Sequence, residues 1–242
     1  MSQRILAVDG LLNARDLGGL PLLRGGETPT GVFYRSETAD RIAATGWDQL
    51  YAKGIRSIVD LRAAAERERD RQPRPEWLTT AVADLDGPEN RDFWPYFEDS
   101  GLDGTAAYFT PLLAAMPERM GSVLTALAEA PPGGVLFHCA GGRDRTGLTA
   151  MVLLALVGVE PAAIVADYLE TLRLGGSFEM TTDANHELTP IDDLLAGYGT
   201  TAEKAFEEAL SALDLDDLLP RAGVPRATRE TLESWRGHLP RS

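Results

Sequence analysis

The sequence predicts an α/β fold with a mainly parallel central sheet flanked by helices. Short apolar runs typical of strands alternate with longer stretches of helical periodicity, and this alternation favours strand–helix–strand units. Glycine and proline are spread along all 242 residues, and we find no repeat, low-complexity tract or linker. We therefore expect a single domain over 1–242, a length sufficient for one well-buried core.

The expected strands are short apolar runs bounded by turn residues. They cover 31–35, 55–61, 77–85 and 135–138. A polar, aromatic loop is expected over 86–103, and the sequence Pro-Pro-Gly-Gly is a hard break before the last strand. The strand at 55–61 is apolar enough to be buried on both faces, as in a parallel sheet.

The expected helices lie between and after these strands. They cover 45–53, 63–71, 104–129, 146–157, 161–172, 201–213 and 228–239. Gly54 is expected to end the first helix, and Pro161 occupies a favoured first-turn position. The stretch 104–129 should break near Pro111 and Pro117, because proline removes a helical hydrogen bond. An irregular segment over 173–200 is expected to form a lid or insertion, with the C-terminal helices of 201–242 packed around the sheet.

The charge balance bears on the partners that the chain can have. It has 23 basic and 37 acidic residues, a formal net charge of −14, which disfavours nucleic acid and anionic membranes as partners. A phosphorylated ligand would be repelled at long range, so its site must be a local basic pocket. No apolar run approaches the roughly 18 residues of a spanning helix, and the N-terminal run is too short for a secretory signal. A cytoplasmic location is expected, although unconventional export has no readable signal, and the oligomeric state is left open.

The chain has one cysteine, Cys139, which excludes an internal disulfide and a multi-cysteine metal site. An isolated cysteine is usually a small core residue. Here, however, it lies between an expected strand end and an expected helix start, where backbone N–H groups and the helix dipole favour an anion. Gly141 and Gly142 let a ligand approach the backbone closely. We therefore expect Ala140, both glycines and Arg143 to line an anion site.

Five residues separate Cys139 from Arg145. In one loop, this spacing lets the guanidinium fork bridge two phosphate oxygens while the sulfur faces phosphorus. The positive surroundings favour the thiolate, which is the nucleophile needed for a thiophosphoryl intermediate. We expect Thr146 to donate a hydrogen bond to the sulfur and His138 to support the loop through its ring nitrogens.

The stretch His-Cys-Ala-Gly-Gly-Arg-Asp-Arg-Thr-Gly at 138–147 resembles the signature of protein-tyrosine phosphatases, in which His-Cys is followed by five residues, Arg, and Ser or Thr. It is most similar to the loop of the atypical bacterial tyrosine/serine and lipid phosphatases, in which Asp commonly precedes the signature Arg. Further similar stretches cover nearly the whole chain. They are Asn-Ala-Arg-Asp-Leu-Gly-Gly at 13–19, Tyr-Arg-Ser at 34–36, Val-Asp-Leu-Arg at 59–62, the run 158–168 and the tail from 201.

The resemblance implies a protein-tyrosine-phosphatase-like fold, no metal or other cofactor, and a two-step covalent mechanism. It implies phosphotyrosine in proteins as the substrate, with phosphoserine/threonine or phosphoinositides as further substrates. Classical members take their general acid from a Trp-Pro-Asp loop, but here Trp94 and Pro95 are followed by Tyr96. In the atypical group the aspartate inside the loop has this role, which assigns it to Asp144. The alternative for Asp144 is an ion pair with a neighbouring arginine.

Other acidic residues are further candidates near the loop. Asp60 ends the 55–61 strand and is expected to brace Arg145 or Arg62, with proton transfer as its second possible role. Asp84 and Asp86 follow the next strand and are outside candidates for the acid.

Three residues in the similar stretches have separate interpretations. Arg15 and Asp16 are expected to be structural and to hold the N-terminal strands near the site. Arg143 stands where many atypical members have a lysine associated with phosphoinositide cleavage, so lipid activity is implied less strongly.

Two other functions are compatible with a cysteine in an anion-binding loop. One is sulfur transfer, and the other is a phosphate-binding module that no longer turns over. The arginine after five residues and the threonine that follows it favour phosphate over sulfur chemistry. A binding module would not need the thiolate.

Overall fold

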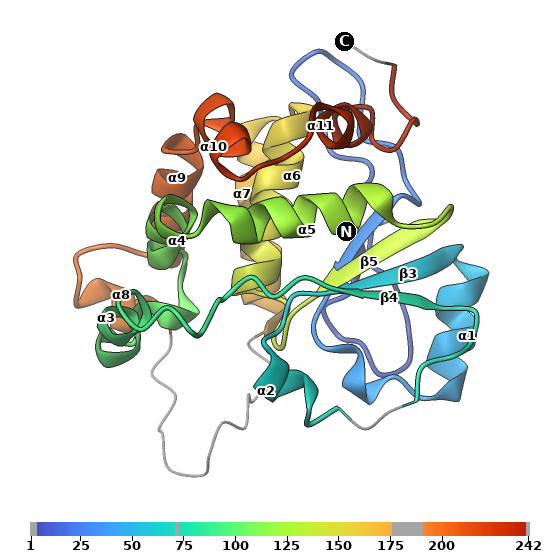
Figure 1. Ribbon diagram of the computed structural model, residues 1–242, viewed down its shortest axis with the longest axis horizontal. Helices are drawn as coiled ribbons and strands as arrows, with labels where there is room; N and C mark the ends of the chain where they lie inside the picture. The colour runs from blue at the N-terminus through green and yellow to red at the C-terminus, as the bar shows by residue number, and fades with distance from the viewer. Residues whose placement is uncertain (1–3, 71–72, 176–190, 241–242) are drawn as a thin grey trace.

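The computed structural model describes residues 4–70, 73–175 and 191–240. Its centre is one five-stranded sheet (Figure 1). In spatial order the strands are β1 (Arg15–Asp16), β2 (Phe33–Ser36), β5 (Gly134–His138), β3 (Ile55–Asp60) and β4 (Thr79–Val82). The pairs β2–β5, β5–β3 and β3–β4 are parallel and β1–β2 is antiparallel, which confirms the expected mainly parallel sheet.

Alternate side chains of the central strands face two different helical layers, as the period of two in a strand requires. Ile58 and Leu136 belong to a cluster with Trp47 of helix α1 (Ala44–Ala52). Val59 and Phe137 belong to a second, larger cluster with α5 and α6 on the other face (Figure 1). The central strands are therefore buried on both faces, and their carboxyl ends meet at one edge of the sheet near α2.

The helices of the described residues surround this sheet. After α1 they are α2 (Ala64–Arg67), α3 (Trp94–Ser100), α4 (Phe109–Ala115), α5 (Pro117–Glu129), α6 (Asp144–Val157), α7 (Pro161–Gly175), α8 (Ile191–Ala196), α9 (Ala202–Ser211), α10 (Leu215–Arg221) and α11 (Arg226–Glu233). Short 3₁₀ turns cover Ala39–Arg41, Leu102–Gly104 and Ala106–Tyr108. None of the helices in these ranges has the length and apolarity needed to cross a membrane.

The expected loop over 86–103 is wrong, because it contains α3. Pro95 lies in the first turn of this helix, where a missing N–H costs nothing, and Gly101 ends it at φ 70°. The ring of Phe97 is buried and packs against Tyr108. The aromatic residues that looked like loop residues are therefore an anchoring face of the helix.

The expected break at Pro111 is also wrong, whereas the one at Pro117 is confirmed. Pro111 lies in the first turn of α4, where the backbone N–H groups have no helical partner to lose. The chain breaks at Met116, and Pro117 begins α5.

Two expected helix ends change, and two helices lie where none was expected. Helix α2 ends at Arg67 rather than at 71. The last helix ends at Glu233, and Trp235 and Arg236, both at positive φ, follow it. Helix α10 was not expected, and α8 lies within the segment expected to be irregular. Most of the proposed lid, 176–190, lies outside the described residues.

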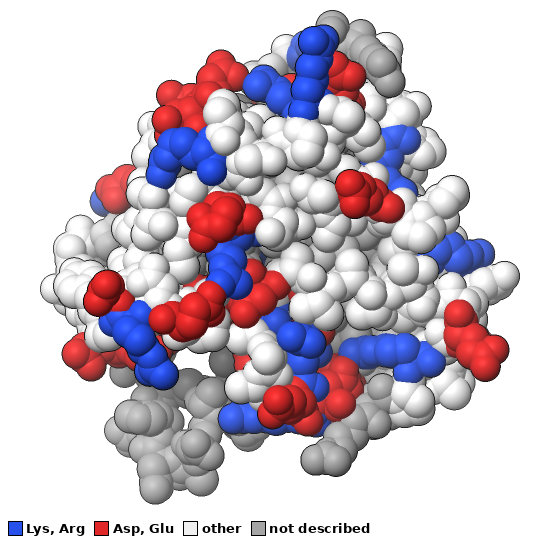
Figure 2. Space-filling model, viewed as in Figure 1, with Lys and Arg blue, Asp and Glu red and all other residues white. Residues whose placement is uncertain are grey.

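Charged side chains of both signs are interspersed over the face shown in Figure 2. Acidic side chains gather there over the stretch of chain between β4 and α3, with arginines among them (Figures 1 and 2). This stretch is one side of the site described next.

Candidate active site

The loop that joins β5 to α6 lies at the centre of the sheet edge. In the parallel register His138 of β5 pairs with Ser36 of β2 on one side and with Asp60 of β3 on the other. The residues after both neighbouring strands therefore flank the loop. Thr38 donates its backbone N–H to the carbonyl of Ala140 at 2.8 Å, which fixes the loop against the end of β2.

Cys139 is the first residue of this loop, and its side chain is almost fully covered, with 2% exposed. It is not isolated from the charged groups of the loop. Burial lowers the pKa of Arg145, but the bonded carboxylate of Glu66 and then the neighbouring Cys139 raise it well above its ordinary value. Cys139 directly follows β5 and Arg145 lies in the first turn of α6, so the two residues stand at the two ends of the same loop.

The guanidinium of Arg145 is held by two carboxylates. Its Nη1 and Nη2 lie 2.5 and 2.8 Å from the two carboxylate oxygens of Glu66, a bidentate pair. Nη1 also lies 2.7 Å from Oδ2 of Asp86. The fork that would bridge two phosphate oxygens is thus occupied by oxygens of the protein, which resemble phosphate in charge and spacing.

Both carboxylates are themselves positioned by their elements. Glu66 accepts the backbone N–H of Ala63 at the start of α2. Trp94 of α3 donates its indole N–H to the carbonyl of Asp86 at 2.8 Å. Burial raises the pKa of Asp86 most strongly, and the nearby charges of Glu66 and Asp84 add to this, so that it reaches about 6 although Arg145 opposes the shift.

Asp60 braces Arg62, one of the two arginines expected for it, and does not contact Arg145. Two of the guanidinium nitrogens of Arg62 lie 2.9 and 2.8 Å from the two carboxylate oxygens of Asp60. Burial raises the pKa of Asp60 most strongly, but the bonds and charge of Arg62 and the nearby His138 together outweigh it, and the pKa is lowered. A carboxyl group that stays ionised in this way is a poor proton donor.

His138 and Thr146 lie where the sequence places them, but only one makes the expected bond. Nδ1 of His138 lies 2.9 Å from the carbonyl oxygen of Cys139, and burial lowers the pKa of His138, so a neutral ring supports the loop. The buried hydroxyl of Thr146 has no hydrogen-bond partner among the described residues. The expected bond from Thr146 to the sulfur is therefore not made in this structure.

Asp144 and Arg143 form a pair within the loop. Nε of Arg143 lies 3.0 and 3.2 Å from the two carboxylate oxygens of Asp144. Nη2 of the same guanidinium donates to the carbonyl of Gly104 at 2.9 Å. The ion pair given as the alternative for Asp144 is thus present, and Arg143 reaches out to the 102–104 turn.

The underside of the loop is built by residues whose role sequence reasoning missed. Arg35 donates to the carbonyl of Gly142 at 2.9 Å and to Oδ2 of Asp167 at 2.7 Å. Asp167 also accepts a bond of 2.9 Å from Nε of Arg15, which confirms the structural role of that arginine. Asp16 has a structural role too, because its carboxylate accepts the N–H groups of Gly18 and Gly31.

Gly142 shows why the loop needs glycine at this point. Its φ is 69°, and a Cβ there would lie 2.5 Å from the backbone nitrogen of Glu37. Both Arg35 and Asp167 lie in stretches that carried the family resemblance. Their spacing of 132 residues gave no reason to pair them with each other or with this glycine.

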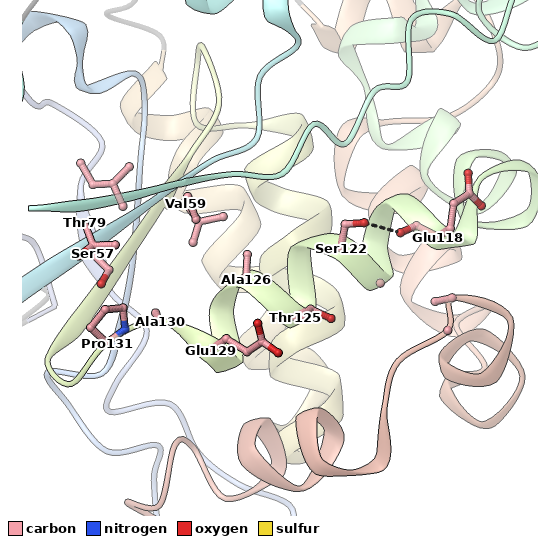
Figure 3. Close-up of a pocket in the computed structure, with 15 residues that line it drawn as sticks. Ser57, Val59, Thr79, Glu118, Ser122, Thr125, Ala126, Glu129, Ala130 and Pro131 are labelled. Carbon is pink, nitrogen blue, oxygen red and sulfur yellow. Dashed lines mark hydrogen bonds between the residues drawn. The ribbon is translucent and has the colours of Figure 1, made fainter.

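A separate cavity of about 630 Å³ lies between α5 and the β3–β4 part of the sheet (Figure 3). Its lining includes Ser57 of β3, Thr79 of β4, and Thr125 and Glu129 of α5. No residue of the 138–146 loop lines it, so this cavity is not part of the site described above.

The sequence comparisons identify the family of the chain. A model of the tyrosine phosphatase family matches residues 6–216, and the chain belongs to that family. It is therefore a hydrolase of phosphoric monoesters.

Several named proteins are similar to the chain. A protein of Cupriavidus necator named as a putative tyrosine-protein phosphatase is 29% identical over 223 residues, covering 86% of this chain and 81% of that one. A tyrosine-protein phosphatase of Nostoc commune is 31% identical over 150 residues, covering 61% of this chain and 51% of that one. The triple specificity protein phosphatase PtpB of Mycobacterium tuberculosis is 29% identical over 170 residues, covering 58% and 61%. The crystal structure of a Cys-to-Ser variant of TpbA of P. aeruginosa in complex with pTyr has 18% identity and a TM-score of 0.42, covering 79% and 86%.

Proposed function

We propose that this chain hydrolyses phosphotyrosine in proteins through a thiophosphoryl intermediate on Cys139. The observation that carries the proposal is the placement of Cys139 directly after β5 and of Arg145 in the first turn of α6, at the two ends of one glycine-containing loop. The names of its relatives, all of them protein phosphatases, support the substrate class.

In the first step the thiolate of Cys139 attacks phosphorus. A sulfur–phosphorus bond forms, the bond from phosphorus to the tyrosine oxygen breaks, and that oxygen takes a proton. Arg145 and the backbone N–H groups of 140–145 stabilise the equatorial oxygens, because positioned charge carries most of the barrier reduction in phosphoryl transfer. Arg145 must exchange at least part of its contact with Glu66 and Asp86 for the phosphate.

In the second step water attacks the phosphorus of the intermediate. The sulfur–phosphorus bond breaks, the thiolate leaves, and phosphate is released. A base must accept a proton from that water, and the carboxylate that gave its proton in the first step fits this role. The expected bond from Thr146 would stabilise the departing sulfur if the hydroxyl turned toward it.

The proton donor is assigned to Asp144 by the family resemblance, and the structure supplies a rival. Asp144 begins α6 on the loop itself, where it is paired with Arg143. Asp86 contacts the guanidinium that would bind phosphate, and its raised pKa of about 6 leaves part of it protonated near neutral pH. An acid must reach the leaving oxygen directly or through one water.

Hydrolysis of phosphoserine/threonine or phosphoinositides is a weaker part of the proposal. The name of PtpB, a triple specificity phosphatase, supports a broad range. Arg143, however, is already bonded to Asp144 and to the carbonyl of Gly104, so it is less available for a second phosphate of a lipid headgroup.

The test compares the full chain with its Cys139→Ser and Cys139→Ala variants on a phosphotyrosyl peptide and on p-nitrophenyl phosphate. We expect kcat to fall by about 10⁴-fold or more in both, because no other thiol can replace the nucleophile. Circular dichroism checks that both variants fold. Activity retained by Cys139→Ala would remove the covalent mechanism. Sulfur release from thiosulfate without phosphate release from either ester would favour sulfur transfer, and phosphopeptide binding without turnover would favour a binding module.

A further inference from the structure

The cavity between α5 and the β3–β4 part of the sheet exists because small side chains line one face of α5. These are Gly121, Ser122, Thr125 and Ala126. Their spacing of three and four residues places them on one face of the helix. Larger side chains at these positions would fill the space against the sheet. At about 630 Å³ the cavity has the size of sites that bind small organic molecules.

A buried hydroxyl on the sheet side of this cavity has no partner. Ser57 of β3 is 2% exposed, and its Oγ forms no hydrogen bond with any described residue. It lies on the same face of the strand as Val59, which packs toward α5, so its side chain is directed toward the cavity (Figure 3). A buried hydroxyl without a hydrogen bond is destabilising, and native proteins contain few of them. A polar atom of a ligand in the cavity would complete it.

The remaining lining is partly polar and partly apolar. Thr79 of β4 and Thr125 of α5 add two hydroxyl groups (Figure 3). Val59, Ala81 and Ala126 provide an apolar surface between the sheet and the helix. A ligand that matches this lining has one strongly polar group and a short apolar body.

The charge around the cavity favours a cation. Glu118 and Glu129 line it, both are exposed, and neither forms an ion pair with another described residue. The described residues of the lining include no lysine or arginine. An anionic ligand such as a phosphate ester would therefore meet only like charges here.

The end of α5 adds to this preference. Helix α5 ends at Glu129, and the next two residues, Ala130 and Pro131, line the cavity. The C-terminal end of a helix carries partial negative charge on its unpaired carbonyl groups. Arg236 already uses this end of the helix, because its guanidinium donates to the carbonyls of Ala130 and Pro131. It does so without lining the cavity.

We propose that this cavity binds a small organic molecule with a protonated amine and a short apolar body. The amine donates to the hydroxyl of Ser57, while Glu129 and the end of α5 supply the opposite charge. The apolar body packs on Val59, Ala81 and Ala126. This site is separate from the loop between β5 and α6, so the inference does not rest on the proposed phosphotyrosine hydrolysis.

The test is isothermal titration calorimetry of the full chain at pH 7 with phenethylamine and 2-phenylethanol. The two probes share a ring and a two-carbon linker and differ in the charge of the polar group. We expect the Kd of the amine to be lower by about tenfold or more, because hydrogen bonds that involve a charged group are stronger. Equal affinities, tighter binding of the alcohol, or no binding of either probe would overturn the proposal.

The variant Ser57→Ala separates a ligand-binding role from a structural one. Its hydroxyl has no partner to lose, so the Tm without probe should be unchanged or raised. The Kd of phenethylamine should nevertheless rise by about fivefold or more. A lowered Tm with an unchanged Kd would make Ser57 a structural residue and overturn the proposal.

Two further variants test the charge and the space of the site. Glu129→Gln should raise the Kd several-fold, whereas Glu208→Gln, an exposed residue of α9 outside the lining, should leave it unchanged. Ala126→Leu should abolish binding by filling the cavity, with circular dichroism as the check on folding. Equal weakening by both glutamate variants would assign the effect to net charge, and full affinity in Ala126→Leu would place the amine elsewhere. Either result would overturn the proposal. No phosphate ester is present in these titrations, so their outcome is independent of the activity tests on Cys139.

Discussion

The underside and the mouth of the loop between β5 and α6 contain the same kinds of charged residue but use them in opposite ways. Below the loop, Arg15, Arg35 and Asp167 are each about 1% exposed, and both arginines are bonded to Asp167. At the mouth, Arg145 is paired with Glu66 and Asp86, which are 32% and 21% exposed. The underside is closed to any ligand, whereas the pairs at the mouth occupy groups that a phosphate needs.

This contrast separates two roles for ion pairs around one loop. The buried cluster fixes the backbone of Gly142 and has nothing to exchange, so its loss should appear as lost stability. In the proposed mechanism the carboxylates at the mouth compete with the substrate for Arg145, so their loss should appear in substrate binding and catalysis.

The largest effect is expected for Asp167→Asn on stability. Burial raises the pKa of Asp167, but the guanidinium groups of Arg15 and Arg35 outweigh it and hold the pKa far below its ordinary value. Removing the carboxylate charge leaves two buried cations unpaired, which costs about 3–5 kcal/mol of unfolding free energy. Urea denaturation measures this, with Glu170→Gln on the same helix as an exposed-pair control that should change by less than about 1 kcal/mol. Similar values for both variants would mean that the underside is not the rigid part of the loop.

The next largest effect concerns the proton donor at the mouth. Asp144→Asn should slow hydrolysis of phenyl phosphate by about 10²-fold or more and that of an ester with a very acidic leaving group far less. The acidic leaving group needs no proton, which is why the two rates should separate. Asp86→Asn, tested in the same way, is the matched comparison. If Asp86→Asn shows the leaving-group dependence and Asp144→Asn does not, the role moves to Asp86.

A smaller effect is expected for Glu66→Gln on phosphate binding. The amide keeps an acceptor for the N–H of Ala63 but loses the charge that competes for Arg145. Inorganic phosphate should therefore inhibit the variant several-fold more tightly than the wild type, measured as a fall in the inhibition constant. Glu68→Gln, an exposed residue at the end of the same helix, should leave the constant unchanged. Weaker inhibition in Glu66→Gln would instead mean that Glu66 orients the guanidinium rather than competing for it.

The sequence allowed the sheet and the loop to be predicted because both depend on local patterns. The apolar runs of β3 and β5, the position of Cys139 between strand and helix, and its spacing to Arg145 are all readable from short stretches. Helix α3 was missed for a tertiary reason, because the rings that looked like loop residues are covered by Tyr108.

The partners of the charged residues could not be predicted, because they depend on contacts across the fold. Arg35 meets Asp167 across 132 residues, and Arg145 meets Glu66 across 79. The sequence left two arginines, Arg62 and Arg145, as candidate partners of Asp60. The structure shows that the partner is Arg62. Motifs thus identify which residues lie near the loop, whereas the ion pairs that these residues form with one another can be known only from the three-dimensional structure.

The smallest effect is expected for Asp86→Asn, on the way the unfolding free energy depends on pH. The ordinary pKa of an aspartate is 3.8, and burial together with nearby acidic groups raises that of Asp86 to about 6 in the folded chain. A raised folded-state pKa gives stability at pH values below the unfolded pKa, and this stability is lost as pH rises through about 6. The variant Asp86→Asn has no carboxyl group that ionises at this position, so it does not lose this stability as pH rises. Relative to wild type, the unfolding free energy of this variant should therefore improve by about 1–2 kcal/mol between pH 4 and pH 7.5, after allowance for partial solvent screening.

Urea denaturation at several pH values measures this difference directly. Asp60→Asn is the control with the opposite sign, because the bond from Arg62 lowers the pKa of Asp60 in spite of its burial. A group with a lowered pKa contributes stability above its unfolded pKa, so this variant should fall further behind wild type as pH rises from about 2 to 5. The unfolding free energies of the two variants, each relative to wild type, should therefore change with pH in opposite directions. If they changed in the same direction, Asp86 would be as firmly paired as Asp60, and it could not release Arg145 to a phosphate.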